Sequence, residues 1–263
     1  MSGDARWDDL APRVISAVLM LFVGGLELWL GGQTFFALCM VIGAGMVWEL
    51  SRMIAPDQKS LSLGLAFLAF LSLPHADIVP RAIAPLLFLI PAIVGVVFLP
   101  REKLRFAFFA VAVLWAVFAL TQLREVYGLI WVLWLFLVVI ATDVAGYFAG
   151  KTFGGPKFWP AISPKKTWSG TAGGWVAAAV VGIVFASFTE ANFLLAVLSV
   201  AMSFASQMGD IAESAFKRRM GVKDSSDLIP GHGGLFDRFD GFLGAVLFLF
   251  ILGYFITLPQ VMI

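Results

Sequence analysis

Residues 128–149 read G-L-I-W-V-L-W-L-F-L-V-V-I-A-T-D-V-A-G-Y-F-A, a run in which Asp143 is the single charged residue. An α-helix needs about 20 predominantly apolar residues to cross a bilayer, so this run predicts a membrane-spanning helix. In the whole chain of 263 residues, 60% are hydrophobic and 13% are charged, whereas about 25% are charged in soluble domains. Apolar runs of this length favour helices over the shorter alternating segments of a β-barrel. The predicted fold class is therefore an all-α, polytopic integral membrane protein.

Further apolar runs bring the prediction to about nine transmembrane helices. These spans are expected at residues 14–31, 34–53, 61–73, 82–99, 106–122, 128–149, 171–188, 193–208 and 242–258. The third is short, and Pro85 and Pro91 should kink the fourth. The first is expected to be a retained span, since the residues before it lack the features of a signal peptide. We predict an N-terminal region of five spans at 1–125 and a second region at 126–263, with polar segments at 150–170 and 209–241.

The positive charges are strongly biased to one side of these predicted spans. With nine spans, 16 of the 18 Lys and Arg residues fall on the side of the N-terminus, and only Arg81 and Arg124 fall on the other. Cytoplasmic loops of membrane proteins carry an excess of Lys and Arg. The N-terminus and both long polar segments are therefore predicted to be cytoplasmic.

The most highly charged stretch is residues 210–240, D-I-A-E-S-A-F-K-R-R-M-G-V-K-D-S-S-D-L-I-P-G-H-G-G-L-F-D-R-F-D. Charge at this density between two apolar runs indicates either a solvated loop or a site for a metal ion and phosphate groups. Its six acidic residues are Asp210, Glu213, Asp224, Asp227, Asp237 and Asp240, and its five basic residues are Lys217, Arg218, Arg219, Lys223 and Arg238.

The first part of this stretch should continue the preceding span as a helix. At 3.6 residues per turn, Asp210, Glu213, Ser214 and Lys217 would share one face. Two acids followed by a base suit a divalent cation beside a phosphate. An ordinary surface helix with a Glu213–Lys217 ion pair fits the local pattern equally well.

The glycine-rich turn at Pro230–Gly234 cannot be regular helix. Its three glycines allow unusual backbone angles and let N–H groups approach an anion closely. Asp237 follows at once, and with Asp210 it could hold Mg²⁺ through oxygen ligands. His232 is a candidate metal ligand, base or hydrogen-bond donor.

Two further features involve the other polar segment and the span before it. Ser163-Pro164-Lys165-Lys166-Thr167 offers two ammonium groups and two hydroxyls, either for a polyphosphate or anionic lipid head, or simply as positive-inside lysines. Asp143 is a functional-site hypothesis because carboxylates inside a membrane are costly. Glu27 and Glu49 have weaker cases, since we expect each near a helix end.

The motifs of the C-terminal half resemble the signature of the phosphatidate cytidylyltransferases, also called CDP-diacylglycerol synthases. The pattern is S-x-x-K-R from Ser214, Lys223-Asp224, and P-G-H-G-G-L-F-D-R-F-D from Pro230 to Asp240. The Ser163–Thr167 run and Asp143 extend the resemblance.

The resemblance implies transfer of a cytidylyl group from CTP to phosphatidate, with Mg²⁺ as cofactor and Asp210 and Asp237 as its ligands. The implied catalytic residues are Asp210, Asp237, Lys217, Arg218, Lys223, Asp224, His232 and Asp240. The implied substrate-binding residues are Ser163, Lys165, Lys166, Thr167, Gly233, Gly234, Arg238 and Asp143. Individual roles for Lys223, Asp224, His232 and Asp240 are left open.

The expected partners are CTP, phosphatidate and the lipid bilayer, without nucleic acid, and the resemblance also implies a homodimer. The expected location is the bacterial inner (plasma) membrane, with a cytoplasmic active site. Alternative functions are another lipid nucleotidyl- or phosphotransferase, of the CDP-archaeol synthase or polyprenol kinase type, and a transporter. A transporter would spread buried charges over several spans, whereas here they gather in two polar segments.

Overall fold

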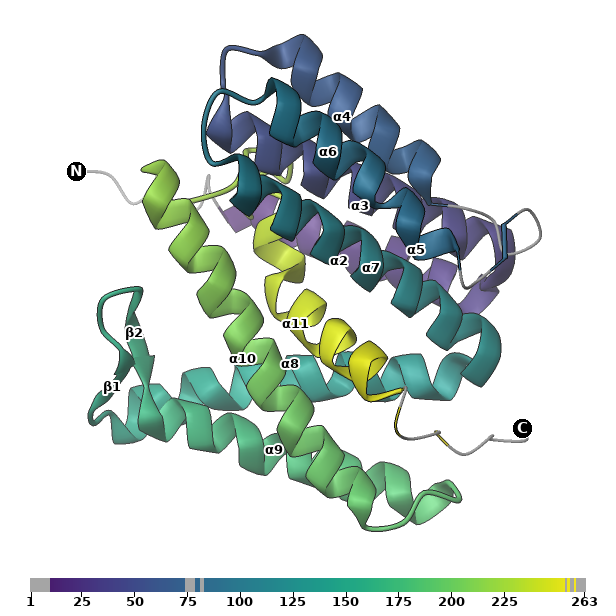
Figure 1. Ribbon diagram of the computed structural model, residues 1–263. Coiled ribbons are helices and arrows are strands. Elements are labelled where there is room, and N and C mark those ends of the chain that lie inside the picture. The colour runs from purple at the N-terminus through teal and green to yellow at the C-terminus, as the bar shows by residue number, and fades with distance from the viewer. Residues whose placement is uncertain (1–9, 74–78, 81–82, 254, 256–257, 259–263) are drawn as a thin grey trace. The chain divides into compact units, whose positions relative to one another are not determined.

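The computed structural model describes residues 10–73, 79–80, 83–253, 255 and 258 (Figure 1). Within these residues, six helices are long and apolar enough to cross a membrane, which supports a multi-pass, mainly helical membrane protein. They are the helices containing Pro12–Leu30, Gly32–Ile54, Lys103–Tyr127, Leu129–Phe153, Trp168–Phe188 and Leu194–Met220. The count of about nine spans is therefore not confirmed, although each of the nine predicted runs contains helix.

The chain forms two compact units. Unit 1 comprises Met1–Thr121 and Met220–Phe239, and unit 2 comprises Gln122–Arg219 and Asp240–Ile263. The boundaries between the units lie inside helices. Unit 1 is discontinuous in sequence, because its second segment follows most of unit 2. The two-region division predicted at residue 125 stays a prediction, and the segment 220–239 had been assigned to its second region.

Unit 1 contains the N-terminal helices. They are α2 (Leu10–Leu30), α3 (Gly32–Ile54), α4 (Lys59–Ser72), α5 (Ala84–Leu87), α6 (Leu89–Phe98) and α7 (Lys103–Tyr127) as far as Thr121. Helix α3 packs along α4, and α4 packs against α6 (Figure 1). The core includes Val47, Leu65 and Phe106, which are fully buried.

Among the predicted spans of unit 1, the third is short as expected, and the fourth departs from the prediction. Helix α4 has 14 residues, about 21 Å at 1.5 Å per residue, which is shorter than the roughly 30 Å hydrocarbon core. The fourth predicted span forms two helices, α5 and α6, rather than one kinked helix. The proline ring of Pro91 would clash with the carbonyl of Leu87, four residues earlier, and α5 ends at Leu87.

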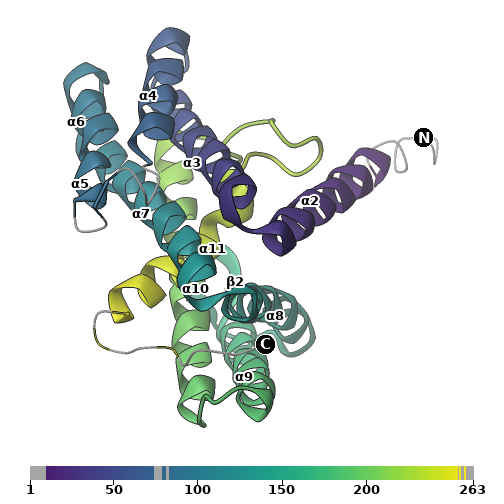
Figure 2. The same ribbon diagram turned by 90° about the vertical axis from the view of Figure 1, so that its right-hand side faces the viewer.

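Unit 2 contains α8 (Leu129–Phe153), the strands β1 (Lys157–Trp159) and β2 (Ser163–Thr167), α9 (Trp168–Phe188), α10 (Leu194–Met220), and α11 (Phe236–Leu252) from Asp240 onward. Helices α8 and α9 lie side by side (Figure 2). Small residues allow this approach, since a Cβ on Gly170 would lie 2.7 Å from the carbonyl oxygen of Gly146.

Polar side chains inside unit 2 fix α10 against its neighbours. The Trp134 indole donates to Ser199 Oγ at 3.0 Å, and Thr142 Oγ1 donates to Ser203 Oγ at 2.8 Å. Hydrogen bonds between spanning helices replace the water that the bilayer lacks. The register of α10, which carries the first part of the charged stretch, is therefore defined by α8.

The polar segment 150–170 contains a hairpin that the sequence analysis did not predict. Strands β1 and β2 pair antiparallel, with Lys157 opposite Thr167 and Trp159 opposite Ser163. Pro164 lies in β2, in agreement with the extended geometry expected around it. Thr167 then caps α9 by accepting a hydrogen bond from the Gly170 amide.

Candidate functional site

The charged stretch begins as the predicted continuation of a helix, because α10 runs through to Met220. One turn apart on it, Ser214 Oγ donates to Asp210 Oδ1 at 3.2 Å, and Lys217 Nζ lies 2.7 Å from Glu213 Oε1. The predicted shared face is thus present. The Glu213–Lys217 pair of the surface-helix alternative also forms, but Glu213 is 1% exposed rather than solvated.

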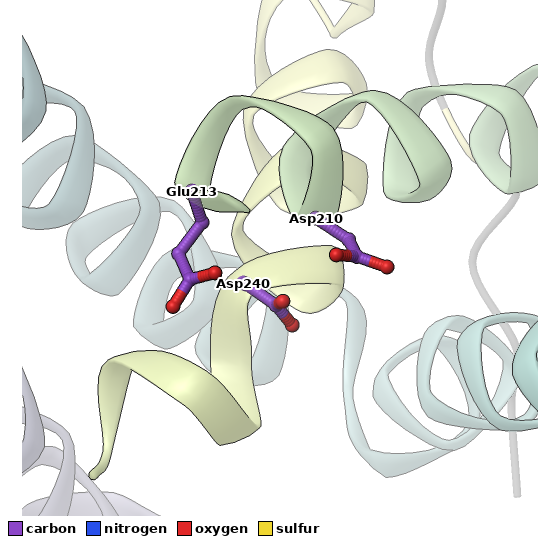
Figure 3. A group of neighbouring side chains, drawn as sticks. All are labelled: Asp210, Glu213 and Asp240. Atoms are coloured by element: carbon purple, nitrogen blue, oxygen red, sulfur yellow. The ribbon is translucent and has the colours of Figure 1, made fainter. Parts of the chain in front are cut away.

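Three carboxylates of unit 2 converge on one point. Asp210 and Glu213 extend from α10, and Asp240 approaches them from α11 (Figure 3). One carboxylate oxygen from each lies within 4.8 Å of the other two. Glycines let the two helices come close, since a Cβ on Gly209 would collide with the Asp240 carbonyl oxygen.

The electrostatics of this three-carboxylate cluster favour a bound cation. Asp240 precedes the apolar part of α11, and burial, followed by the nearby Asp210 charge, raises its pKa to about 7. Lys166 forms an ion pair with Asp210, and Lys217 pairs with Glu213. Mg²⁺ is bound by one or two carboxylates together with water and phosphate oxygens. The donor set therefore fits this ion.

A cavity of about 380 Å³ in unit 2 leads to this cluster. Its lining includes Asp210, Lys165 and Lys166, with Asp143 and Thr167 among the other members. Ammonium groups beside a carboxylate suit a phosphate chain carrying a divalent ion.

In unit 1, residues 221–235 form a loop, and the two buried carboxylates of Glu49 and Asp237 hold this loop in place. Asp237 Oδ2 accepts hydrogen bonds from the amide of Ser225 (2.8 Å), the hydroxyl of Ser225 (2.7 Å) and the amide of Gly234 (2.8 Å). An aspartate with three donors on one oxygen, near the start of a helix, organises the surrounding backbone. In this structure Asp237 thus connects two parts of the loop, at Ser225 and at Gly234.

Glu49 of α3 is the second of these carboxylates and is 0% exposed. It accepts from the amides of Leu235 (2.8 Å) and Phe236 (2.7 Å), at the N-terminus of α11. The hydroxyls of Ser226 (2.6 Å) and Ser225 (3.2 Å) also donate to it. Glu49 therefore supplies the acceptors that the first amides of a helix lack.

The glycine-rich turn adopts the unusual backbone that its composition predicts. Gly231 and Gly233 have φ of 75° and 81°, a region that residues with a Cβ rarely adopt. Gly234 is required for space, because a Cβ there would collide with Glu49 and Ser225. His232 Nδ1 lies 2.8 Å from Ser16 Oγ of α2, which also donates to the Pro230 carbonyl.

A second cavity, of about 500 Å³, is lined by this loop and by α2. Three cationic side chains border it: Arg13, Lys223 and Arg238. Asp224, Asp227 and His232 lie on its wall as well. Unit 1 thus has a polar, predominantly cationic pocket of its own.

Comparison with known proteins identifies the family. The model of the cytidylyltransferase family matches residues 11–256. The chain belongs to the cytidylyltransferase family. Relatives of this family include the phosphatidate cytidylyltransferases of Brucella suis, 35% identical over 262 residues, and Bacillus subtilis, 32% identical over 263 residues. These matches cover 96% of both chains for the first, and 93% of this chain and 97% of the relative for the second.

The predicted site residues of this cytidylyltransferase family member fall into separate groups. Asp210 and Asp240 lie in the three-carboxylate cluster with Glu213. Lys165, Lys166, Thr167 and Asp143 line the unit 2 cavity. Lys223, Asp224, His232, Gly233 and Arg238 line the unit 1 cavity.

The remaining predicted residues lie outside the linings of these two cavities. Lys217 pairs with Glu213, Arg218 is exposed in the last turn of α10, and Ser163 begins β2. Gly234 and Asp237 belong to the hydrogen-bonded core of the loop. The predicted Asp210–Asp237 metal pair spans two units and stays a prediction.

Sequence reasoning undervalued Glu49 and missed two residues of α2. Glu49 is an ionisable residue inside an apolar run, which was the available signal. Arg13 entered only the count of positive charges, although it lines the unit 1 cavity. Nothing in the local sequence pairs Ser16 with a histidine more than 200 positions away.

Proposed function

We propose that this protein transfers the cytidylyl group of CTP to phosphatidate, giving CDP-diacylglycerol and pyrophosphate in phospholipid biosynthesis. Near full-length similarity to phosphatidate cytidylyltransferases supports this function. The observation that carries it is the unit 2 cavity, where Lys165 and Lys166 border Asp210 of the three-carboxylate cluster. The family match does not favour a polyprenol kinase, a CDP-archaeol synthase or a transporter.

The chemistry needs charge neutralisation and alignment more than a strong base. A phosphate monoester has its second pKa near 6, so the phosphatidate oxygen is already ionised at neutral pH. That oxygen forms a bond to the α-phosphorus of CTP. The bond from this phosphorus to the α,β-bridging oxygen breaks, and pyrophosphate leaves with the electron pair. Positioning and electrostatic stabilisation account for most of the catalysis in such transfers.

The residues of unit 2 suit the nucleotide. Lys165 and Lys166 would neutralise phosphate oxygens, and Lys166 already pairs with Asp210. Asp210, Glu213 and Asp240 would hold Mg²⁺, which when bound neutralises charge on the triphosphate. For Asp237, the other predicted ligand, we also propose a role in holding Mg²⁺, in addition to the hydrogen bonds that it accepts in the loop.

The reaction is tested with purified protein in detergent, supplied with labelled CTP and phosphatidate. We expect CDP-diacylglycerol and pyrophosphate in equal amounts, with turnover that disappears on chelation of Mg²⁺. Transfer of the cytidylyl group to an archaetidic substrate, or of the γ-phosphoryl group of CTP to a polyprenol with release of CDP, would assign an alternative function. Folded protein that forms no CDP-diacylglycerol would overturn the proposal.

We further propose that the polar segments face the cytoplasm from the bacterial inner membrane. Lys157 and Glu190 are exposed and precede and follow α9, a candidate span. In a background with Cys39→Ala, Lys157→Cys should react with an impermeant maleimide only after the membrane is opened, whereas Glu190→Cys should react in intact spheroplasts. The reverse pattern would contradict this orientation. The homodimer stays a prediction.

A further inference from the structure

We infer that unit 1 binds the lipid substrate, with the phosphate in the cationic pocket and an acyl chain in an adjoining groove. The headgroup pocket is the 500 Å³ cavity bordered by Arg13, Lys223 and Arg238. The chain groove is a second hollow of about 340 Å³, lined by α3, α4 and Leu228. This inference rests on the proposed function, because it assigns phosphatidate, one of the two substrates of that reaction, to a binding site in unit 1.

The headgroup pocket has the charge that a phosphomonoester requires. Its three cationic side chains exceed the two carboxylates of Asp224 and Asp227. A phosphomonoester carries a charge of about −1.5 to −2 at pH 7, and Arg binds phosphate oxygens in a fork geometry. Arg13 lies directly against the turn, since a Cβ on Gly231 would collide with its side chain.

The chain groove has the complementary chemistry. Ala44, Gly45 and Trp48 of α3 face Leu63, Ala66, Phe67 and Phe70 of α4. Leu63 and Phe67 are each 63% exposed, so the groove is open on its outer side. Such a surface offers water almost no hydrogen-bonding group and favours a hydrocarbon chain.

The two hollows are lined by consecutive residues of one loop. Leu228 lines the chain groove, while its neighbours Asp227 and Ile229 line the headgroup pocket. Consecutive Cα atoms are 3.8 Å apart, so the two hollows border the same short stretch of backbone. The backbone here is fixed, because the Ile229 amide donates to Gly233 (2.8 Å) and the His232 amide donates to Ile229 (2.9 Å).

This continuity identifies the occupant. A molecule that fills both hollows has an anionic phosphate at one end and a hydrocarbon chain at the other. Phosphatidate has this form, whereas CTP has no apolar chain. A zwitterionic phospholipid could occupy the groove but would lack the phosphomonoester that the three cations match.

Binding is measured without turnover, using full-length protein in nanodiscs and phosphatidate with a diazirine in its acyl chain. We expect crosslinks to peptides containing residues 44–48 and 63–70, and Ala66→Phe should reduce them severalfold by filling the groove. Ala37→Phe, an exposed alanine of α3 outside the groove, is the matched control and should label normally. Labelling elsewhere, or equal labelling by a phosphatidylcholine probe, would overturn the inference.

Kinetics test the headgroup pocket separately. Arg13→Gln should raise KM for phosphatidate about tenfold, as expected for the loss of one charge-assisted contact, and leave KM for CTP within about twofold. Lys59→Gln, which removes an exposed charge from the start of α4, should change neither constant. A rise in KM for CTP alone would place the nucleotide in this pocket and overturn the inference. If wild-type protein crosslinks phosphatidate as expected but makes no CDP-diacylglycerol, the proposed function fails while the lipid site stands.

Discussion

Asp210→Asn is expected to lower kcat by about a thousandfold or more while the folded protein remains as stable as the wild type. Asp210 is the residue shared by the three-carboxylate cluster and the unit 2 cavity. Metal stabilisation of developing charge is worth several kcal/mol, and each 1.36 kcal/mol corresponds to a factor of ten in rate. Stability should be preserved because the substitution relieves repulsion with Glu213 and Asp240. The ion pair with Lys166 that it weakens is partly exposed and contributes little.

The measurement pairs steady-state kinetics with the apparent Tm in the presence and absence of Mg²⁺. A ligand that binds only the folded state raises Tm, so wild-type protein should gain stability from Mg²⁺ and Asp210→Asn should gain much less. Glu190→Gln removes one negative charge from the exposed turn after α9 and serves as the control. Near-normal turnover by Asp210→Asn, or an undiminished Mg²⁺ shift, would rule out this cluster as the metal site.

Glu49→Gln is expected to reduce both stability and activity by disordering the loop of residues 221–235. The carboxylate receives four donors, two amides at the start of α11 and two serine hydroxyls. A glutamine retains one oxygen and turns an NH₂ group toward the amides of Leu235 and Phe236 and the Ser226 hydroxyl, whereas the Ser225 hydroxyl keeps Asp237 Oδ2 as an acceptor. A buried donor left unsatisfied costs about 1–3 kcal/mol, so the loss should reach about 3 kcal/mol, or a fall of roughly 6–12 °C in apparent Tm.

The control for this substitution is Asp57→Asn, in the exposed turn between α3 and α4. It changes the same charge near the same helix and should leave Tm and turnover unaltered. Limited proteolysis adds a local readout, since cleavage between residues 220 and 239 should accelerate in Glu49→Gln alone. A change in Tm below about 2 °C with intact activity would show that the loop does not depend on Glu49.

Much of the fold follows from the periodic and apolar patterns of the sequence. The run at 128–149 became α8, and the helical spacing of Asp210 and Glu213 became a shared face of α10. Both depend on interactions within a few residues, which local sequence reports well. Pro91 also indicated a disturbance of the fourth predicted span. A kink was expected there, whereas the helix ends at Leu87 and a new one begins at Leu89.

The candidate site could be predicted only in part, because its contacts are remote in sequence. Asp240 joins Asp210 and Glu213 through the close crossing of α10 and α11 at Gly209. Glu49 meets serines that follow it by more than 170 residues. Local spacing does not indicate which remote residue such a carboxylate contacts. It also does not indicate whether the carboxylate binds a metal ion or accepts hydrogen bonds from backbone amides. For Asp237 the motif indicated a metal ligand, which stays a prediction, and local spacing did not indicate the hydrogen bonds that its Oδ2 accepts.

The discontinuous composition of unit 1 has a consequence for biosynthesis. Its helices α2 to α6 emerge from the ribosome well before residues 220–239. The hydrogen-bond donors to Glu49 belong to that later segment. During this interval the Glu49 carboxylate lacks the donors that it has in the folded protein, so the nascent N-terminal helices cannot yet close around it. Unit 1 is then completed only when its second segment, residues 220–239, has been synthesised. A gene cut at Gly128, between α7 and α8, should accordingly yield two fragments that mature only when they are synthesised in the same membrane.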